Sequence, residues 1–195
     1  FRIEFDGRLD VKTWAAFANM TYALSDQLSV KAGARYSWEK RNLKNNTGIG
    51  DGPTGFLLDS VRTGIPMWDV SKTWKDFSPS LGLEYRPNDD LLLYANWSRG
   101  FKSGTAEIGS TRRLSLTQPL PFVDPEKVEA FEVGTKYSGG DLRANLAVFF
   151  QRLKNGQFSL TRPIPTPPFF TSTLTNAAVS EAYGAEFELF WRPAP

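Results

Sequence analysis

The sequence predicts an all-β fold, an antiparallel sheet of the type that closes into a transmembrane β-barrel. Three observations support this prediction: apolar and polar residues alternate along seven segments, short and long connections alternate between those segments, and aromatic residues gather at the segment ends. Since a packed protein core also selects for alternation, a soluble β-sandwich is the alternative that these observations must exclude.

Composition removes several classes of function. The chain has 195 residues, 23% of them charged, and a formal net charge of only +2, so no strongly basic surface predicts a nucleic-acid partner. It has no Cys and no His, which excludes disulfides, imidazole metal sites and His-dependent catalytic triads from this stretch. We therefore expect no enzyme, no metal site and no cofactor. No apolar run approaches the roughly 18 residues of a membrane-spanning helix.

The alternation is clearest at residues 28–39. Leu28, Val30, Ala32, Ala34, Tyr36 and Trp38 are apolar, and the residues between them are polar, charged or Gly. Side chains of a strand point alternately to two faces, so this segment has one apolar and one polar face. Similar patterns, less regular in the first and fourth ranges, occur at residues 14–22, 77–86, 91–104, 126–137, 142–151 and 183–192. The sequence thus predicts about seven strands and no helix.

The connections alternate in length. Three are tight turns of Ser, Asp, Asn, Gly and Pro residues, at 25–27, 87–90 and 138–141. Three are long segments rich in Gly, Pro, Ser, Thr or Asn, at about 40–73, 103–125 and 155–175. A compact soluble domain rarely carries several loops longer than about 15 residues. Short turns at one rim and long loops at the other are typical of a bacterial outer-membrane barrel.

Strand length and aromatic position favour lipid over a protein core. The predicted strands have about 10 to 13 residues, enough for a tilted bilayer crossing, and their apolar face contains many Ala residues. Amphipathic rings concentrate at the two membrane interfaces. We expect one girdle beside the tight turns, at Tyr22, Tyr85, Tyr137 and Trp191, and another near the long loops, at Trp14, Tyr36, Trp38, Trp97, Phe101 and Phe150.

The opposite face carries charges of both signs, which suits a lumen wall that pairs with another protein part or with itself. Two arginines, Arg99 and Arg152, break the alternation and are predicted to point to the lipid side near the long-loop rim. One hypothesis is that they contact lipid phosphates there; the alternative is that their guanidinium groups reach ordinary water.

Four stretches resemble TonB-dependent outer-membrane receptors. Three of them are SPSLGLEYRPNDDLLLYANWSRGFKSG, DPEKVEAFEVGTKYSGGDLRANLAVFFQRLKN and TNAAVSEAYGAEFELFWRP, at residues 78–104, 124–155 and 175–193. FANMTYALSDQLSVKAGARYSWEKR, at residues 17–41, resembles a preceding barrel hairpin of the same family. Their order and spacing together carry the resemblance more than any one phrase does.

The resemblance implies a multi-pass barrel of about 22 strands in the outer membrane of a Gram-negative bacterium, plugged by a separate N-terminal domain. About seven strands cannot close that circumference, so residues 1–195 are expected to be an internal segment of the barrel domain, with the plug and the closing strands outside this chain. The implied partners are outer-membrane lipid and lipopolysaccharide, the TonB complex acting through the plug, and a small ligand.

Among ligands the resemblance points first to a ferric siderophore, with cobalamin, haem and oligosaccharides left open. A passive porin of the same architecture and a soluble carbohydrate-binding β-protein remain alternative functions, and an outer-membrane enzyme is disfavoured by the absence of His.

Ligand contacts are expected in the long loops. A ferric chelate is often anionic and partly aromatic, so Arg and aromatic side chains are suitable contacts. The candidates are Trp68, Trp74, Arg112, Arg113, Phe169 and Phe170. The alternative for each is that these side chains pack on one another within the loops.

Overall fold

The computed structural model of the chain describes residues 2–50, 56–59, 68–106, 122–163 and 170–193. Within these ranges the side chains are described except at residues 2–7, 45–50, 56–59, 68, 170, 171 and 173. The described residues form strands and turns, and none of their segments is helical. No helix in this part of the chain is therefore long and apolar enough to cross a membrane.

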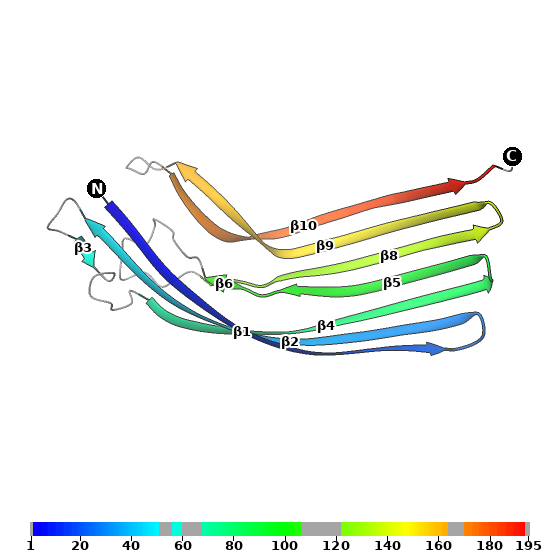
Figure 1. Ribbon diagram of the computed structural model, residues 1–195, viewed down its shortest axis with the longest axis horizontal. Helices are drawn as coiled ribbons and strands as arrows, with labels where there is room; N and C mark the ends of the chain where they lie inside the picture. The colour runs from blue at the N-terminus through cyan, green and yellow to red at the C-terminus, as the bar shows by residue number, and fades with distance from the viewer. Residues whose placement is uncertain (1, 51–55, 60–67, 107–121, 164–169, 194–195) are drawn as a thin grey trace.

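Ten strands follow one another in the described residues (Figure 1). Seven of them are long and three are short. The seven long strands confirm the number that the sequence predicts. They are β1 (Arg2–Ala23), β2 (Leu28–Gly50), β3 (Phe56–Asp59), β4 (Trp68–Asn88), β5 (Leu91–Lys102), β6 (Thr105–Ala106), β7 (Phe122–Val123), β8 (Glu126–Gly139), β9 (Leu142–Pro163) and β10 (Phe170–Trp191).

The seven long strands form one antiparallel sheet in the order β1-β2-β4-β5-β8-β9-β10, so each pairs with its neighbour in the chain. β3 adds a short strand to β2, while β6 and β7 pair with each other apart from the main sheet. In the described part of the chain β1 and β10 each have one strand neighbour, so the sheet is open at both edges. The predicted antiparallel barrel-type meander is confirmed, as an arc of a barrel.

Tight turns close the sheet at one end. Between β1 and β2, the Ser25 hydroxyl accepts hydrogen bonds from the N–H groups of Gln27 and Leu28. Between β8 and β9, Gly140 has φ of 54°, a left-handed conformation that Gly adopts without the steric cost of a Cβ atom. The three predicted short connections therefore lie at the same rim (Figure 1).

The strand register separates two faces. Residues directly opposite one another in antiparallel strands share a face. One row across the sheet is entirely apolar: Met20, Ala32, Leu81, Trp97, Phe131, Phe150 and Tyr183. The neighbouring row, on the other face, is Thr21, Lys31, Gly82, Asn96, Glu132, Phe149 and Gly184. The predicted apolar and polar faces are thus continuous over all seven long strands.

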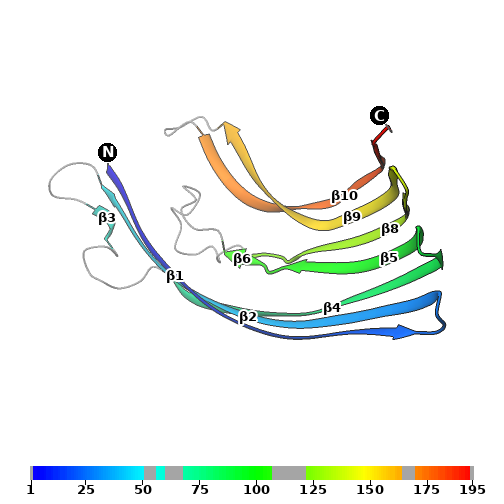
Figure 2. The ribbon, with the colours of Figure 1, turned by 45° about the vertical axis from the view of Figure 1, so that its right-hand side comes forward.

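The polar face is the concave one. The two described ends of the connection between β5 and β8 lie on this face: Ser103 contacts Glu39 of β2, and Asp124 contacts Asn176 of β10. The two ends of one connection, paired with each other through β6 and β7, can reach strands so far apart only inside the curve of the sheet. Figure 2 shows β6 lying between the rising ends of β1 and β2 and those of β9 and β10.

On the convex face, large apolar side chains are exposed even in the middle of the sheet. Leu81 on β4 is 54% exposed and Val133 on β8 is 55% exposed. Chains that fold in water rarely expose a continuous apolar surface of this kind, whereas a barrel wall presents it to lipid. The arrangement excludes the two-sheet core of a β-sandwich for the described residues, because no second sheet covers this face.

The predicted extent of the long loops is wrong. β2 continues to Gly50, β4 begins at Trp68, β9 continues to Pro163 and β10 begins at Phe170, so much of the ranges 40–73 and 155–175 is strand. The ladder between β1 and β2 runs without interruption to Arg2 and Gly50. In residues 40–50 most side chains are polar or absent, so the two-residue alternation is weak there while the backbone hydrogen bonds continue.

Pro79 marks the point where β4 leaves β5. Pro79 lies opposite Ala34 of β2 inside the sheet, and the ladder between β4 and β5 stops at the next pair, Ser80 and Ser98. Proline has no N–H to donate to a neighbouring strand, so the end of this ladder is the expected consequence. β5 continues to Lys102 paired only with β8, which leaves room for its connection to turn inward.

Candidate functional site

The concave face at the long-loop end of the sheet, called the mouth here, carries an inner layer. After β5 the chain turns over the concave face, and Thr105–Ala106 of β6 pairs with Phe122–Val123 of β7 before the chain enters β8. Ser103, Gly104, Ala106 and Val123 are buried in this layer. Ala106 packs with Leu43 of β2 in a small apolar cluster that Leu9, Val70 and Phe122 border.

A carboxylate on β2 ties this layer to the sheet. The Ser103 hydroxyl donates a hydrogen bond to Glu39 Oε1 at 2.5 Å, and Arg41 Nε donates to the same oxygen at 2.6 Å. Thr13 of β1 donates its hydroxyl to Glu39 Oε2 at 3.3 Å. Glu39 therefore joins β1, β2 and the connection that follows β5.

The electrostatic setting of Glu39, one residue beyond Trp38 on the mouth side, favours its ionised form. Partial burial acts to raise the pKa of Glu39, but the hydrogen bonds from Ser103 and Arg41, the Arg41 charge and the bond from Thr13 outweigh it and lower the pKa below its usual value. The carboxylate is thus charged at neutral pH and holds its three donors.

Trp74 is in the mouth but its ring is covered. It is 7% exposed, its indole lies against Gly104, and the Phe122 ring lies 6.0 Å away at 68°. The Lys72 ammonium lies 5.5 Å from the Trp74 ring and 5.0 Å from the Phe122 ring. Trp74 Nε1 has no hydrogen-bond partner. In this structure Trp74 packs the inner layer onto β4, which is the alternative that the sequence left open; a ligand contact stays a prediction.

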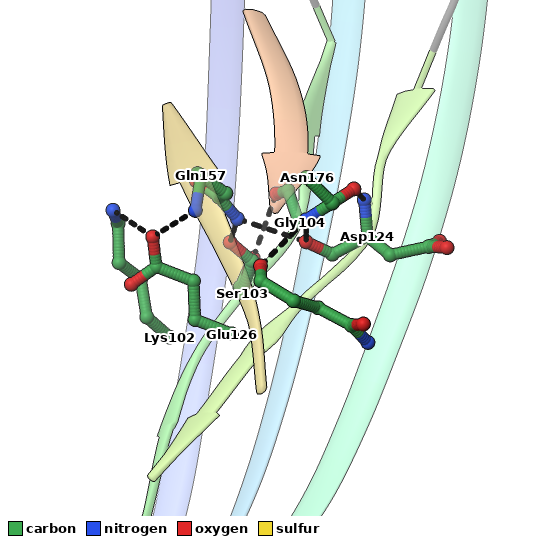
Figure 3. A network of polar contacts seen from close by, with 8 residues as sticks. Lys102, Ser103, Gly104, Asp124, Glu126, Gln157 and Asn176 are labelled. Carbon is green, nitrogen blue, oxygen red and sulfur yellow. Dashed lines mark hydrogen bonds and ion pairs between the residues drawn. The ribbon is translucent and has the colours of Figure 1, made fainter. Parts of the chain in front are cut away.

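Two amides hold the opposite side of the inner layer (Figure 3). Gln157 of β9 and Asn176 of β10 are directly opposite each other in the register. Gln157 Nε2 donates to the carbonyls of Ser103 and Asp124, both at 3.0 Å. Asn176 Nδ2 donates to the carbonyl of Asp124 at 2.9 Å, and Asn176 Oδ1 accepts from the Asp124 N–H at 2.8 Å.

The charged groups of the mouth are largely paired. Lys102 lies 3.1 Å from Glu126. At the same end of the sheet, Lys127, which the register places opposite Phe101 on the convex side, lies 3.2 Å from Asp76, whose side chain is almost fully buried. Lys72 is 3.8 Å from Asp124. The described part of the mouth is therefore a hydrogen-bonded frame of mixed charge, and no group of three acidic, His or Cys side chains among the described residues could hold a metal. Such a frame can fix loops and bind polar groups.

The other predicted ligand contacts remain untested. Trp68 is the first residue of β4, opposite Asn45, and Phe170 is the first residue of β10, opposite Pro163; their side chains are not described. Arg112, Arg113 and Phe169 lie outside the described residues. All five therefore stay predictions.

The predicted lipid-interface aromatics all lie on the convex face. Tyr22, Tyr85, Tyr137 and Trp191 are near the tight turns, while Trp38 and Trp97 are further toward the mouth. Trp38 stacks on Trp14 at 6.3 Å and 17°, and Trp97 lies 6.5 Å from Phe131. This position fits an interface role, and the role itself stays a prediction.

Arg99 and Arg152 belong to a row of alternating charge on the convex face. The register places Arg99 opposite Glu129, Glu129 opposite Arg152, and Arg152 opposite Glu181. Arg152 Nε lies 3.4 Å from Glu181 Oε1, an ion pair without an aligned hydrogen bond, and Lys154 lies 3.6 Å from Glu129. This row is two residues beyond the row of Trp97, Phe131, Phe150 and Tyr183, on the mouth side.

The sequence analysis did not identify several residues of these arrangements, among them Glu129, Glu181, Ser103, Gln157 and Asn176. Glu129 lies two residues before Phe131, and Glu181 lies two residues before Tyr183, so each shares a face with that aromatic residue. The two-residue period therefore predicts their position on the convex face if the alternation is continued to these residues. Ser103 and Gln157 fell within expected loops, Asn176 follows directly after one, and nothing in the sequence marks their tertiary partners.

Comparison with known proteins gives related chains that this chain resembles over nearly its whole length. It is 29% identical over 190 residues to the pesticin receptors of Yersinia enterocolitica and Yersinia pestis, an alignment that covers 97% of this chain and 25% of each receptor. This chain thus spans about a quarter of the length of the curated relatives that it matches.

Solved structures share the fold. The ferric yersiniabactin uptake receptor FyuA from Yersinia pestis superposes with a TM-score of 0.72 at 23% identity, over 99% of this chain and 26% of that one. The copper transporter OprC gives 0.72 at 14% identity, over 94% of this chain and 27% of that one. The Serratia marcescens hemophore receptor HasR gives 0.67 at 23% identity, over 92% and 31%.

The family model described as "TonB dependent receptor-like, beta-barrel" matches residues 2–192. This match covers all seven long strands and both faces described above. The chain therefore belongs to the TonB-dependent receptor-like β-barrel family, whose members are outer-membrane transport receptors of Gram-negative bacteria.

Proposed function

We propose that this chain forms part of the barrel wall of an outer-membrane receptor that takes up a scarce ligand with energy delivered by TonB, and that the ligand is a ferric siderophore complex. The observation that carries the proposal is the inner layer at the mouth. A simple wall would need only the two faces of the sheet, whereas here residues 103–106 and 122–125, the two described ends of the β5–β8 connection, lie over the concave face and are bonded to it.

The nature of the relatives supports the ligand class. The pesticin receptors and the ferric yersiniabactin uptake receptor are related over almost the full length of this chain, and the latter is by its name an uptake receptor for a ferric chelate. The copper transporter and the hemophore receptor share the fold with other cargo, so the fold alone does not choose the ligand. We choose the siderophore because the resemblance of the sequence points to it first, and because the ferric yersiniabactin uptake receptor is one of the structures that cover this chain almost completely.

The test uses the full-length protein in a Gram-negative host that lacks its own receptors. Uptake of radiolabelled ferric siderophores is measured with and without functional TonB. We expect uptake of at least one ferric siderophore that disappears without TonB. Uptake that persists without TonB would indicate the passive porin instead, and membrane localisation without uptake of any chelate would refute the siderophore assignment while leaving the barrel.

Two partners belong to the same proposal. The TonB complex acts through a plug domain outside this chain, and its contact is tested by the TonB arm of the uptake experiment. In this proposal the convex face meets outer-membrane lipid, and Arg99 and Arg152 contact lipopolysaccharide phosphates. Their register positions in the charged row of that face support the contact. Replacing both arginines by Gln should lower the lipopolysaccharide that copurifies with the protein. An unchanged amount of copurified lipopolysaccharide would refute this contact. The role of Arg152 would then be its ion pair with Glu181.

A further inference from the structure

The paired amides of Gln157 and Asn176 hold both ends of the β5–β8 connection. Ser103 begins this connection and Asp124 ends it, and Gln157 Nε2 donates to the carbonyls of both. Asn176 binds the second end on two sides, since it donates to the Asp124 carbonyl and accepts from the Asp124 N–H (Figure 3). A single pair of side chains therefore closes the base of the connection.

The two amides use their full donor capacity. A primary amide has two N–H donors, and a buried or semi-buried amide gains most when both are used. Asn176 gives its second donor to the carbonyl of Asn155 at 2.7 Å, which anchors the amide to β9. Gln157 adds a bond from its own backbone N–H to Glu126 Oε1 at 2.6 Å. Each of these bonds joins the β9–β10 hairpin to the connection or to Glu126 of β8, or holds one of the two side-chain amides in position.

The opposite side of the connection is fixed independently. Ser103 donates to Glu39 of β2, and Gly104 packs on Trp74 of β4. The base of the connection is thus attached to β2 and β4 on one side and to β9 and β10 on the other. To move as a lid it would have to break these bonds together, and each broken bond leaves a carbonyl or N–H group without its partner.

We propose that Gln157 and Asn176 are positioning residues: they form an amide clamp that fixes the inner layer, residues 103–106 and 122–125, across the mouth, so that this described base of the β5–β8 connection is a stationary wall of the ligand entrance. The role in ligand entry rests on the proposed function, whereas the clamp itself does not. A wall that is held in place before the ligand arrives requires no ordering on binding, and this preserves affinity.

The clamp is tested with Asn176→Asp and Gln157→Glu in the full-length protein folded in phospholipid vesicles. Each variant keeps the shape of the side chain but replaces the NH₂ donors by a carboxylate oxygen that faces the Asp124 carbonyl. Hydrogen exchange of the backbone amides in 103–106 and 122–126 should become about tenfold faster, because local opening no longer breaks these bonds. Exchange in β4 and β8 near the tight turns should not change.

Asn145→Asp is the matched control. Asn145 lies on β9, the strand of Gln157, and on the same concave face as both amides. Its Nδ2 donates to Glu188 Oε2 at 3.1 Å near the tight turns, far from the mouth. This variant makes the same chemical change, a carboxylate against an acceptor, and should leave the exchange of 103–106 and 122–126 unchanged. Unchanged exchange in Asn176→Asp and Gln157→Glu would overturn the clamp.

The second measurement separates positioning from general damage. With the radiolabelled ferric siderophore that the wild-type protein transports, both mouth variants should raise the KM of uptake about fivefold while the maximal rate and the amount of receptor at the surface stay the same. Faster exchange with an unchanged KM would overturn the positioning role. If the wild-type protein transports no chelate, the proposed function fails, and the exchange experiment still decides whether the clamp exists.

Discussion

Gly104 lies so close to Trp74 that a Cβ atom on residue 104 would be 2.6 Å from Trp74 Cε2 and 2.4 Å from the carbonyl oxygen of Val123. Gly104 is the point where the chain leaves β5, passes over the indole and begins the inner layer. The absence of a side chain there is a packing requirement, because the backbone conformation of Gly104 is not left-handed.

The first prediction concerns Gly104→Ala. The added methyl group would force the indole or the β7 backbone to shift, at a cost of about 1 to 3 kcal/mol. The inner layer should then exchange its backbone hydrogens faster in vesicles while the tight-turn end stays protected.

A double variant provides the control. Trp74→Ala removes the indole side of the clash, so Gly104→Ala should cost less in the Trp74→Ala background than in the wild type. Equal costs in both backgrounds would show that the two residues are not coupled and would contradict this explanation.

The second prediction concerns pH. The pKa of Glu39 in the folded protein lies below its ordinary value, so the ionised carboxylate stabilises the mouth at pH values above the ordinary carboxyl pKa. This stabilisation is lost as the pH falls through the lowered pKa, when Glu39 takes up a proton. Exchange protection of Ser103 and Gly104 should therefore decrease in acid, after correction for the intrinsic effect of pH on exchange.

Glu39→Gln is the reference for that measurement. It lacks the charge at every pH, so its protection should be lower than that of the wild type at neutral pH, and the difference should disappear in acid. A difference that persists below the lowered pKa would mean that the charge of Glu39 does not hold the network.

The third prediction tests which face meets lipid. Val148 and Ala147 are neighbours on β9, and the register places Val148 on the convex face beside Val133 and Ala147 on the concave face beside Glu186. Val148→Arg should cost about 2 to 4 kcal/mol in the unfolding of the vesicle-bound protein, since the guanidinium would lie in hydrocarbon. Ala147→Arg adds the same charge to the polar concave face and should lower the unfolding free energy much less. Equal costs would contradict the lipid-facing assignment.

The fourth prediction concerns the tight turn between β8 and β9. Gly140 has φ of 54°, and a Cβ atom added to it would meet nothing within 4 Å, so Gly140→Ala would be strained by its backbone alone. The expected loss is about 1 kcal/mol of unfolding free energy. Asp141→Ala, next in the same exposed turn, is the control and should change stability by less. Denaturant unfolding of both variants in vesicles makes this comparison.

The sequence by itself determined the two faces, the tight turns and the antiparallel order. Val30, Ala32 and Ala34 alternate with Lys31, Gly33 and Arg35, and a period of two admits only one arrangement of these side chains in a strand. The turn residues between neighbouring strands then force a meander. These features are local, so a short window of residues is enough to fix them.

The tertiary structure alone decided the length of the strands beyond the apolar band and the construction of the mouth. Glu39 and Ser103 are 64 residues apart, and Asp124 and Asn176 are 52 residues apart. Their contacts depend on the curvature of the sheet, on the separation of β4 from β5 at Pro79 and on the inward path of the next connection. A hydrogen bond between distant residues leaves no periodic pattern, because either partner alone is an ordinary polar residue in an exposed segment.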